Sequence, residues 1–312
     1  MDDHARACVW ETVFDDHDRI NLENGIALIG CISVIASSWL NLTLFLTALK
    51  NDISYRNLAF FTMTACVSRG IPLLFHFRIF AFTGWYNIET VPCQFIGFLG
   101  TFLAVLEVEC LTHVCIERYV VAKYISRGWQ ICKNHYILYP CLCFLFAFLY
   151  SFPALFGFGR YSYDFSCTTC TLDMVLPDTW RKYIVVTIFL LRSVKSTWFM
   201  VMMLIWCRQL EKKFITTAPH HDFTKSTIAV TLVNLLCWSP LALARGMVVL
   251  SQLMEEPALF VPAKLYVKWA LWIYWVSPAA TTMALFAVDQ RLRQKMIHLD
   301  FTEDIPREKK ED

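Results

Sequence analysis

Long apolar stretches alternate with short polar connections along almost the whole chain of 312 residues. Each stretch is long enough to cross a bilayer as a helix, which takes about 20 residues. Helices are expected because backbone groups in lipid must find hydrogen bonds within their own segment. The pattern therefore predicts an all-α fold, a bundle of seven transmembrane helices. The seven spans lie at residues 25–49, 58–82, 93–119, 136–157, 183–207, 226–251 and 265–288.

The same pattern divides the chain into three parts. An acidic and polar N-terminal segment at residues 1–24 precedes a transmembrane domain at residues 25–288, and a tail follows at residues 289–312. In the tail, Leu292 and Met296 share one helical face between cations. We expect a short amphipathic helix there, lying on the membrane surface.

The composition supports a membrane protein. Hydrophobic residues make up 57% of the chain and charged residues 17%, against roughly 25% charged in soluble domains. This leaves too little polar surface to cover a soluble globule. The formal net charge of +2 also offers no strongly basic surface. We therefore predict the lipid bilayer as a partner and no nucleic acid.

Cations gather in the connections after the first, third and fifth spans and in the tail. They are Lys50, Arg56, Lys123, Arg127, Lys133, Arg208, Lys212, Lys213, Arg291, Arg293 and Lys295. Basic short loops mark the cytoplasmic side of a membrane protein. The prediction is that the N-terminus is extracellular and that Cys93 lies on the outer side.

Most of the thirteen cysteines fall inside the spans, where they are expected as small buried apolar residues. Only four lie on the predicted outer side, where disulfides persist. These four are Cys8, Cys93, Cys167 and Cys170.

The third span connects a cysteine to a charged triplet. Cys93 and Glu117 are 24 residues apart, and Glu117 begins the sequence Glu-Arg-Tyr. At about 1.5 Å per helical residue this distance is roughly 36 Å, enough to cross a bilayer core of about 30 Å. A helix here places Cys93 at one membrane face and the triplet at the other.

Several charged residues fall inside the spans, where each needs a partner or a polar cavity. Arg69 in the second span has Glu107 and Glu109 of the third as candidate partners. These two acids point about 200° apart on a helix, so they cannot serve one partner. Glu109 shares a face with His113, which is the only spacing in the chain that suits an acid–base pair. We expect that pair to be a structural contact.

The fifth and sixth spans add three cations. Arg192 and Lys195 are three residues apart and so share a helix face, which we expect to point inward. Arg245 lies two turns beyond Trp238 in the sequence Cys237-Trp238-Ser239-Pro240. Pro240 and Pro278 stand inside the sixth and seventh spans, where we expect kinks.

The order and spacing of these motifs resemble the rhodopsin-like (class A) G-protein-coupled receptors, in particular their opsin branch. The resemblance covers nearly the whole chain. It rests on Asn41, Trp85, the spacing from Cys93 to Glu117-Arg118-Tyr119, the run Gly157-x-x-Arg160-Tyr161 leading to Cys170, and the Cys237–Pro240 motif.

The resemblance implies a set of roles. Cys93 and Cys170 would form a disulfide, and the Glu117-Arg118-Tyr119 triplet would couple to a heterotrimeric G protein at the plasma membrane. Trp238 would be the toggle below the ligand. The implied pocket for a small-molecule ligand comprises Gly100, Arg192, Lys195, Trp238, Leu241 and Arg245. If its three cations point inward, the ligand would be an anion such as a small carboxylic acid.

The chain departs from the opsins at the position of the lysine that binds retinal. Opsins carry that lysine seven residues before a proline of the seventh helix. Counting from Pro278 gives Leu271, and counting from the tail gives Trp275. Neither is a lysine, so we predict no covalent retinal, and we predict no other cofactor and no metal.

A second departure concerns the charge inside the bundle. In the family, an aspartate of helix two and a hydroxyl residue of helix three line a sodium site. Counting 28 residues from Asn41 gives Arg69, and counting 14 from Cys93 gives Glu107. We predict that these two form an intramembrane charge pair in place of the ion. A loop one residue shorter would instead place Ser68 at the helix-two position.

The leading hypothesis is a receptor that passes a small-molecule signal to a G protein, and not an enzyme. The alternatives are a photoreceptor or photoisomerase that holds retinal non-covalently, and a membrane transporter. A transporter would show inverted repeats with helices interrupted at matching positions, which the sequence lacks.

Overall fold

The computed structural model describes residues 16–51, 53–82, 91–125, 133–163, 170–173, 179–213, 221–254 and 264–297. Its long helices are α2 (Asp16–Asn51), α3 (Ile53–Phe82), α4 (Val91–Ile125), α5 (Lys133–Ser151), α8 (His221–Met254) and α9 (Lys264–Val288). A continuous helical run is formed by α6 (Thr179–Leu190), the π-helix η2 (Leu191–Lys195) and α7 (Ser196–Lys213). Six of the predicted spans fall within one of these helices or runs, and the fourth, 136–157, extends beyond α5 into the 3₁₀-helix that follows it.

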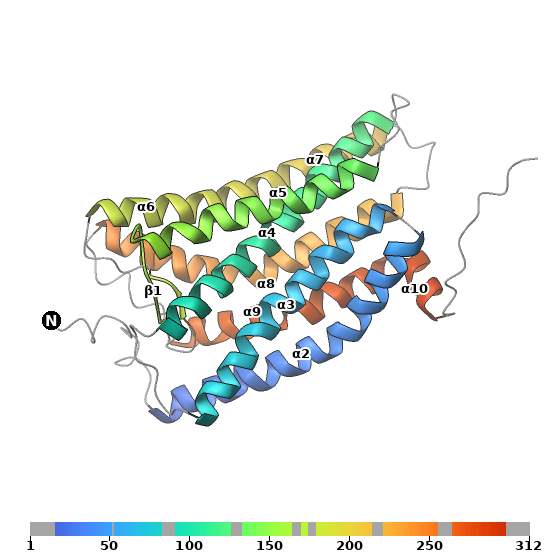
Figure 1. Cartoon of the computed structure of the whole chain (residues 1–312). Coiled ribbons are helices and arrows are strands. Elements are labelled where there is room, and N and C mark those ends of the chain that lie inside the picture. Colours follow the sequence, from blue (N-terminus) through green and yellow to red (C-terminus); the bar gives the residue numbers. More distant parts are fainter. Residues whose placement is uncertain are drawn as a thin grey trace, which may run out of the picture.

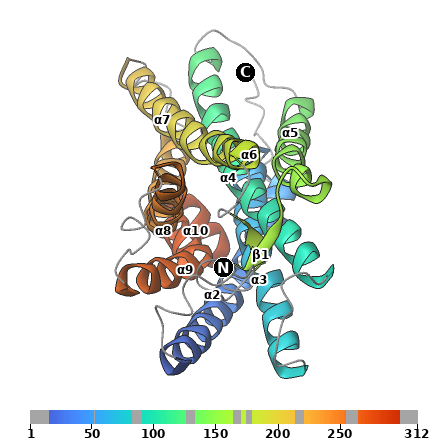
Figure 2. The same cartoon turned by 90° about the vertical axis from the view of Figure 1, so that its left-hand side faces the viewer.

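The helices lie side by side along one long direction (Figure 1). Seen from one end of the bundle, α4 lies near its centre, with the other long helices arranged around it (Figure 2). Among the described residues, five helices are long and apolar enough to cross a membrane, and α2 adds a shorter apolar stretch, Ala27–Leu42. α2 begins at Asp16, ahead of the apolar span predicted from residue 25.

The core of the bundle is apolar and receives side chains from every long helix. Large buried members of this core include Leu44, Phe61, Leu111, Met200, Val230 and Leu285. Equally large apolar side chains, such as Ile35 and Trp39, lie exposed on the outside of the bundle. In water such a surface would be unfavourable, whereas in a bilayer it faces lipid.

One end of the bundle, here called the disulfide end, is covered by a two-stranded hairpin. After α5, the 3₁₀-helix η1 (Phe152–Phe156) ends at Gly157, whose φ of 82° favours glycine. Strand β1 (Tyr161–Tyr163) then pairs antiparallel with β2 (Cys170–Leu172), with Tyr163 opposite Cys170. The Cys93–Cys170 disulfide joins the hairpin to the start of α4, with the two Cα atoms 5.6 Å apart. This disulfide confirms the pairing that the resemblance implied.

Tyr161 fixes the hairpin against the helices. The Gln94 amide donates to the Tyr161 carbonyl oxygen at 2.7 Å, and the Tyr161 N–H donates back to Gln94 Oε1 at 3.3 Å. The phenol hydroxyl donates to the Ser151 carbonyl oxygen at 2.6 Å, and burial raises the pKa of Tyr161, so it stays protonated. The Tyr161 side chain also packs closely on Gly97 of α4. The hairpin is therefore held to α4 and α5 by more than the disulfide.

The opposite end, here called the Arg118 end, carries the short helix α10 (Gln290–Ile297), as predicted for the tail. Asp289 separates it from α9 and is fully buried. The Asp289 carboxylate accepts from the Leu292 N–H at 2.8 Å, which caps α10, and from the Ser226 hydroxyl of α8 at 3.1 Å. Leu292 packs into the core, so α10 is attached to the bundle by its apolar face.

Candidate functional site

A cavity of about 60 Å³ lies beneath the hairpin at the disulfide end. We call it the arginine cavity. Its lining comes from α3, α4, β2, η2, α8 and α9, so a molecule inside it would contact most of the bundle. The lining residues are Ser68, Arg69, Ile96, Gly100, Thr101, Ala104, Cys170, Thr171, Arg192, Leu241, Arg245, Leu271, Tyr274 and Trp275.

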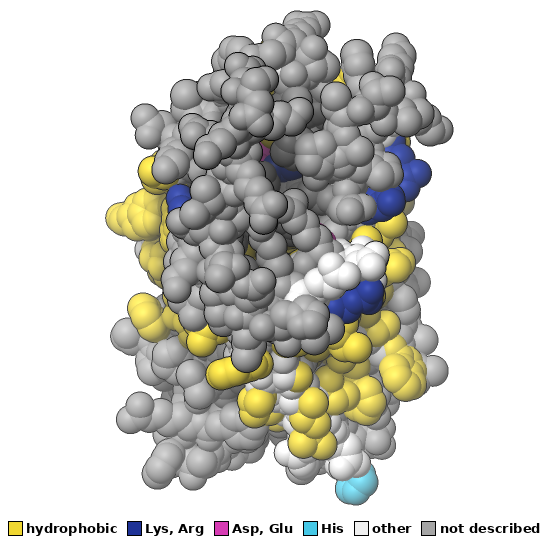
Figure 3. All heavy atoms as spheres, turned by 90° about the vertical axis from the view of Figure 1, so that its right-hand side faces the viewer, with side chains coloured by type: hydrophobic (Ala, Val, Ile, Leu, Met, Phe, Trp, Pro, Cys, Tyr) yellow, Lys and Arg dark blue, Asp and Glu magenta, His cyan; other side chains and the backbone are white. Residues whose placement is uncertain are grey.

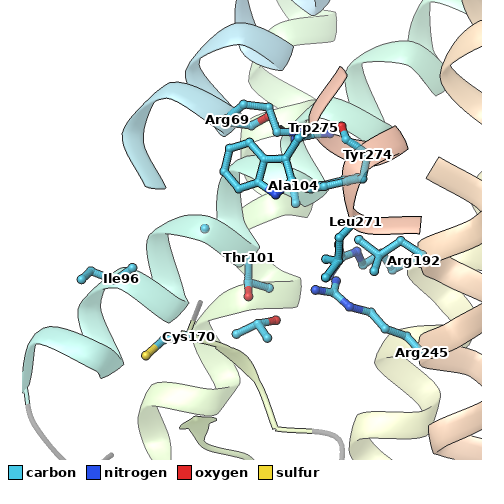
Figure 4. Close-up of a pocket in the computed structure, with 14 residues that line it drawn as sticks. Arg69, Ile96, Thr101, Ala104, Cys170, Arg192, Arg245, Leu271, Tyr274 and Trp275 are labelled. Carbon is cyan, nitrogen blue, oxygen red and sulfur yellow. Dashed lines mark hydrogen bonds between the residues drawn. The ribbon is translucent and has the colours of Figure 1, made fainter. Parts of the chain in front are cut away.

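Two arginines of this lining come from neighbouring helical segments. Arg192 of η2 and Arg245 of α8 reach the cavity close to Leu271 (Figure 4). The Arg192 side chain is only 7% exposed, and its Nε has no hydrogen-bond partner among the described residues. A buried guanidinium nitrogen without a partner is costly, so this wall of the cavity is suited to a hydrogen-bond acceptor with negative charge.

The structure places four of the six predicted pocket residues in the cavity and excludes two. Gly100, Arg192, Leu241 and Arg245 line it. Lys195 and Trp238 are not in the lining: Trp238 packs against the apolar core of the bundle.

Lys195 instead pairs with Glu109 of α4. Its Nζ lies 3.0 Å from Glu109 Oε1, which also accepts from the Ser196 hydroxyl at 3.2 Å. Arg192 and Lys195 both lie in the π-helix η2 and both reach into the bundle, but only Arg192 lines the cavity. The Lys195 ammonium also stands over the Phe146 ring, 5.4 Å from its centroid.

The Glu109 carboxylate is thus bound to Lys195 of η2 and Ser196 of α7. His113 bonds to Glu109 only through Nδ1 and the backbone carbonyl oxygen, at 2.8 Å. Glu109 and His113 therefore form a structural contact rather than an acid–base pair.

Arg69, which lines the arginine cavity, belongs to a buried charge pair. Arg69 Nη1 lies 2.8 Å from Glu107 Oε2, and Arg69 Nη2 lies 3.3 Å from Glu107 Oε1. The carboxylate also accepts from the Ser68 hydroxyl at 2.8 Å and from the Asn234 amide at 3.3 Å. Arg69 Nη2 donates to the Ser277 hydroxyl at 3.2 Å. The network thus joins α3, α4, α8 and α9, and every side chain in it is buried.

Tyr274 connects this network to the cavity. The Arg69 guanidinium carbon lies 3.7 Å from the centroid of the Tyr274 ring, and both residues belong to the cavity lining. Sequence reasoning named Arg69 but missed Tyr274. Helical spacing could have indicated Tyr274, because it follows Leu271, a candidate position of the retinal lysine, by three residues and so lies near the same helix face.

At the Arg118 end, two members of the predicted coupling triplet, Glu117 and Arg118, pair with each other. Arg118 Nη2 lies 2.8 Å from Glu117 Oε1, and the Asn57 amide donates to Glu117 Oε2 at 2.6 Å. Both members of the pair are 2% exposed. The Tyr119 ring turns toward Trp206 of α7, with ring centroids 5.7 Å apart. In this conformation Arg118 is covered, so contact with a partner requires the pair to open.

The two positions at which the resemblance would place a retinal-binding lysine lie in the described cavity. Both candidate lysine positions, Leu271 and Trp275, face the cavity with side chains that carry no amine. Among the described lining residues there is no lysine, and the side chains of Lys264 and Lys268 lie outside the described part of the chain. Cys8, Trp85 and Cys167 also lie outside it.

The arrangement is that of a seven-helix membrane bundle. The crystal structure of squid rhodopsin matches it with a TM-score of 0.71 at 17% identity, covering 91% of this chain and 86% of that one. No family model matches the sequence. The seven-helix prediction is therefore confirmed, and the chain is a multi-pass membrane protein.

Similar sequences include rhodopsins, an opsin and a G-protein coupled receptor. A Gq-coupled rhodopsin of Mizuhopecten yessoensis is 24% identical over 60% of this chain and 41% of its own length. The green-sensitive opsin of Gallus gallus is 23% identical over 71% of this chain and 68% of its own. The G-protein coupled receptor moody of Drosophila pseudoobscura pseudoobscura is 30% identical over 41% of this chain and 20% of its own.

These similarities confirm the resemblance to rhodopsin-like receptors that the motifs indicated. The matched regions span less than half the length of the first relatives, from 41% to 49% of each rhodopsin.

Proposed function

We propose that this protein is a G-protein-coupled receptor that responds to a small organic anion. The observation that carries the proposal is the role of α4 at both ends of the bundle. Near one end α4 lines the arginine cavity, and near the other it holds the buried Glu117–Arg118 pair. A ligand that favours one arrangement of α4 and its neighbours would shift the population in which Arg118 is exposed.

The chemistry of the cavity supports an anion. Arg192 and Arg245 bring two positive charges to one wall, and the buried Nε of Arg192 lacks an acceptor among the described residues. The carboxylate of a small acid would accept charge-assisted hydrogen bonds from such a wall. An amine would be repelled by it.

The size of the cavity supports a small ligand. Its volume of about 60 Å³ is well below the roughly 300–1,000 Å³ of pockets that hold drug-sized molecules. Short-chain carboxylic acids suit this space better than a long polyene such as retinal does.

The proposed topology follows from the cations and the disulfide. The disulfide end would face the outside of the plasma membrane, where the Cys93–Cys170 bond is stable. The Arg118 end would face the cytoplasm and a heterotrimeric G protein. Figure 3 shows this end of the molecule, with lysine and arginine side chains on the face and hydrophobic side chains along its flanks.

The test is a signalling assay in cells that express the full chain. Short carboxylic acids and matched amines are compared with calcium and cAMP readouts. We expect a response to the acids and none to the amines. Arg192→Gln or Arg245→Gln should raise the acid concentration needed for a half-maximal response about ten- to a hundredfold, because each variant loses one charged hydrogen bond. Lys225→Gln, which removes an exposed cation near the far end of α8, serves as the control.

A separate variant tests the coupling end. Glu117→Gln removes the charge that holds Arg118, so we expect raised signalling without ligand. A response to amines that survives both arginine variants would refute the anion proposal. A Glu117→Gln variant that reaches the surface without any basal signal would contradict the proposed role of the pair.

A further inference from the structure

A second cavity lies between α7 and α8, away from the arginine cavity. Its volume is about 390 Å³, within the range of ligand pockets. Val201, Leu204 and Ile205 of α7 form one wall, and Ile228, Leu232 and Leu235 of α8 form the other. We call it the α7–α8 groove.

The groove opens toward the lipid-facing surface and reaches down to the core. Ile205 and Leu232 at its rim are 45% and 54% exposed, whereas Leu204 is 8% exposed and belongs to the apolar core. Its one hydroxyl residue, Thr231, lies next to Cys115 of α4, with Oγ1 3.4 Å from Sγ. The groove therefore offers an apolar slot whose shape and chemistry suit an alkyl chain.

One end of the groove is cationic and polar. Arg208 and Gln209 complete the lining, and the Arg208 side chain is exposed. The preceding Cys207 contacts the Arg118 carbonyl oxygen, with Sγ 3.7 Å away, so Arg208 stands at the depth of the Glu117-Arg118-Tyr119 triplet. Helical rise from Cys93 places this triplet at the membrane surface expected at the Arg118 end, where lipid headgroups would lie.

We propose that the α7–α8 groove binds one acyl chain of an anionic phospholipid, with the headgroup phosphate at Arg208. The occupant follows from charge complementarity. A long alkyl chain matches the apolar slot, and a guanidinium matches a phosphate in bidentate geometry. Anionic lipids are concentrated in the cytoplasmic leaflet, which is the leaflet that the positive-inside distribution assigns to this end.

The test uses the full chain in detergent micelles and native mass spectrometry. Phosphatidylglycerol and phosphatidylcholine with identical acyl chains are offered in equal amounts. We expect phosphatidylglycerol to be retained about five times more, the equivalent of about 1 kcal/mol for one cation near an anionic headgroup. Arg208→Gln should abolish this preference, whereas Arg293→Gln, an exposed cation of α10 at the same end, should not.

A second pair of variants separates the groove from the rest of the surface. Leu232→Trp fills the mouth of the groove and should abolish retention of both lipids. Leu236→Trp is the matched control, since Leu236 is one turn further along α8, is 69% exposed and is not part of the lining. A photoactivatable phosphatidylglycerol should crosslink to peptides of α7 and α8 in the native chain.

Three results would overturn the proposal. The first is equal retention of the two lipids by the native chain. The second is retention that Leu232→Trp leaves unchanged, which would place the lipid elsewhere. The third is a dimer that Leu232→Trp dissociates, which would assign the groove to a second copy of this chain.

Discussion

Arg69 and Glu107 form a two-pronged ion pair at the centre of the bundle, with nitrogen–oxygen distances of 2.8 and 3.3 Å. Neither side chain is more than 4% exposed, so water does little to screen the pair. Ser68, Asn234 and Ser277 supply the remaining hydrogen bonds. The Arg69 guanidinium, paired with the Glu107 carboxylate, therefore lies in the region where the related receptors are expected to hold a sodium ion.

The first prediction concerns this pair. Arg69→Leu or Glu107→Leu leaves one buried charge without its partner, and each should cost about 3–5 kcal/mol of stability. The double variant should lose less than the sum of the two, because it leaves no charge behind. Thermal unfolding and surface expression of the three variants measure the coupling. If the double variant loses the full sum, the two residues do not interact.

The second prediction concerns the close contact between α4 and the hairpin. A Cβ atom at Gly97 would lie 2.7 Å from the Tyr161 Cβ, which is closer than two such atoms approach. Gly97→Ala should therefore displace β1 and lower stability by about 1–3 kcal/mol, as overpacking does. The melting temperature measures the loss.

Gly100→Ala is the matched control for this variant. A Cβ at Gly100 meets no atom within 4 Å, so the stability of the Gly100→Ala variant should be unchanged or slightly higher. Because Gly100 lines the arginine cavity, the same change should weaken the response to a bound acid. Equal melting temperatures for Gly97→Ala and the native protein would show that β1 is not held where the structure places it.

The third prediction is that the protein forms no covalent adduct with retinal. Leu271 and Trp275 occupy the two positions where the resemblance would place a retinal-binding lysine, and both line the cavity. Purified protein incubated with 11-cis-retinal and reduced with borohydride should carry no retinyl group by mass spectrometry. A retinyl adduct on Lys264 or Lys268 would contradict the prediction.

Features that depend on distance along a single helix could be predicted from the sequence. The seven spans, the placing of Cys93 and the Glu117 triplet at opposite ends of α4, and the amphipathic character of α10 all follow from helical rise and period. The Arg69–Glu107 contact could also be predicted, because a charge at bilayer depth needs a partner and the spans contain few acidic residues.

Features that depend on how helices pack were decided only by the tertiary structure. Within the π-helix Leu191–Lys195, Lys195 pairs with Glu109 while Arg192 lines the cavity, and the pattern of the sequence does not predict this separation. The α7–α8 groove likewise depends on how two helices pack against each other. A sequence records which face each residue occupies, but the neighbour that this face meets is set by packing across the whole bundle.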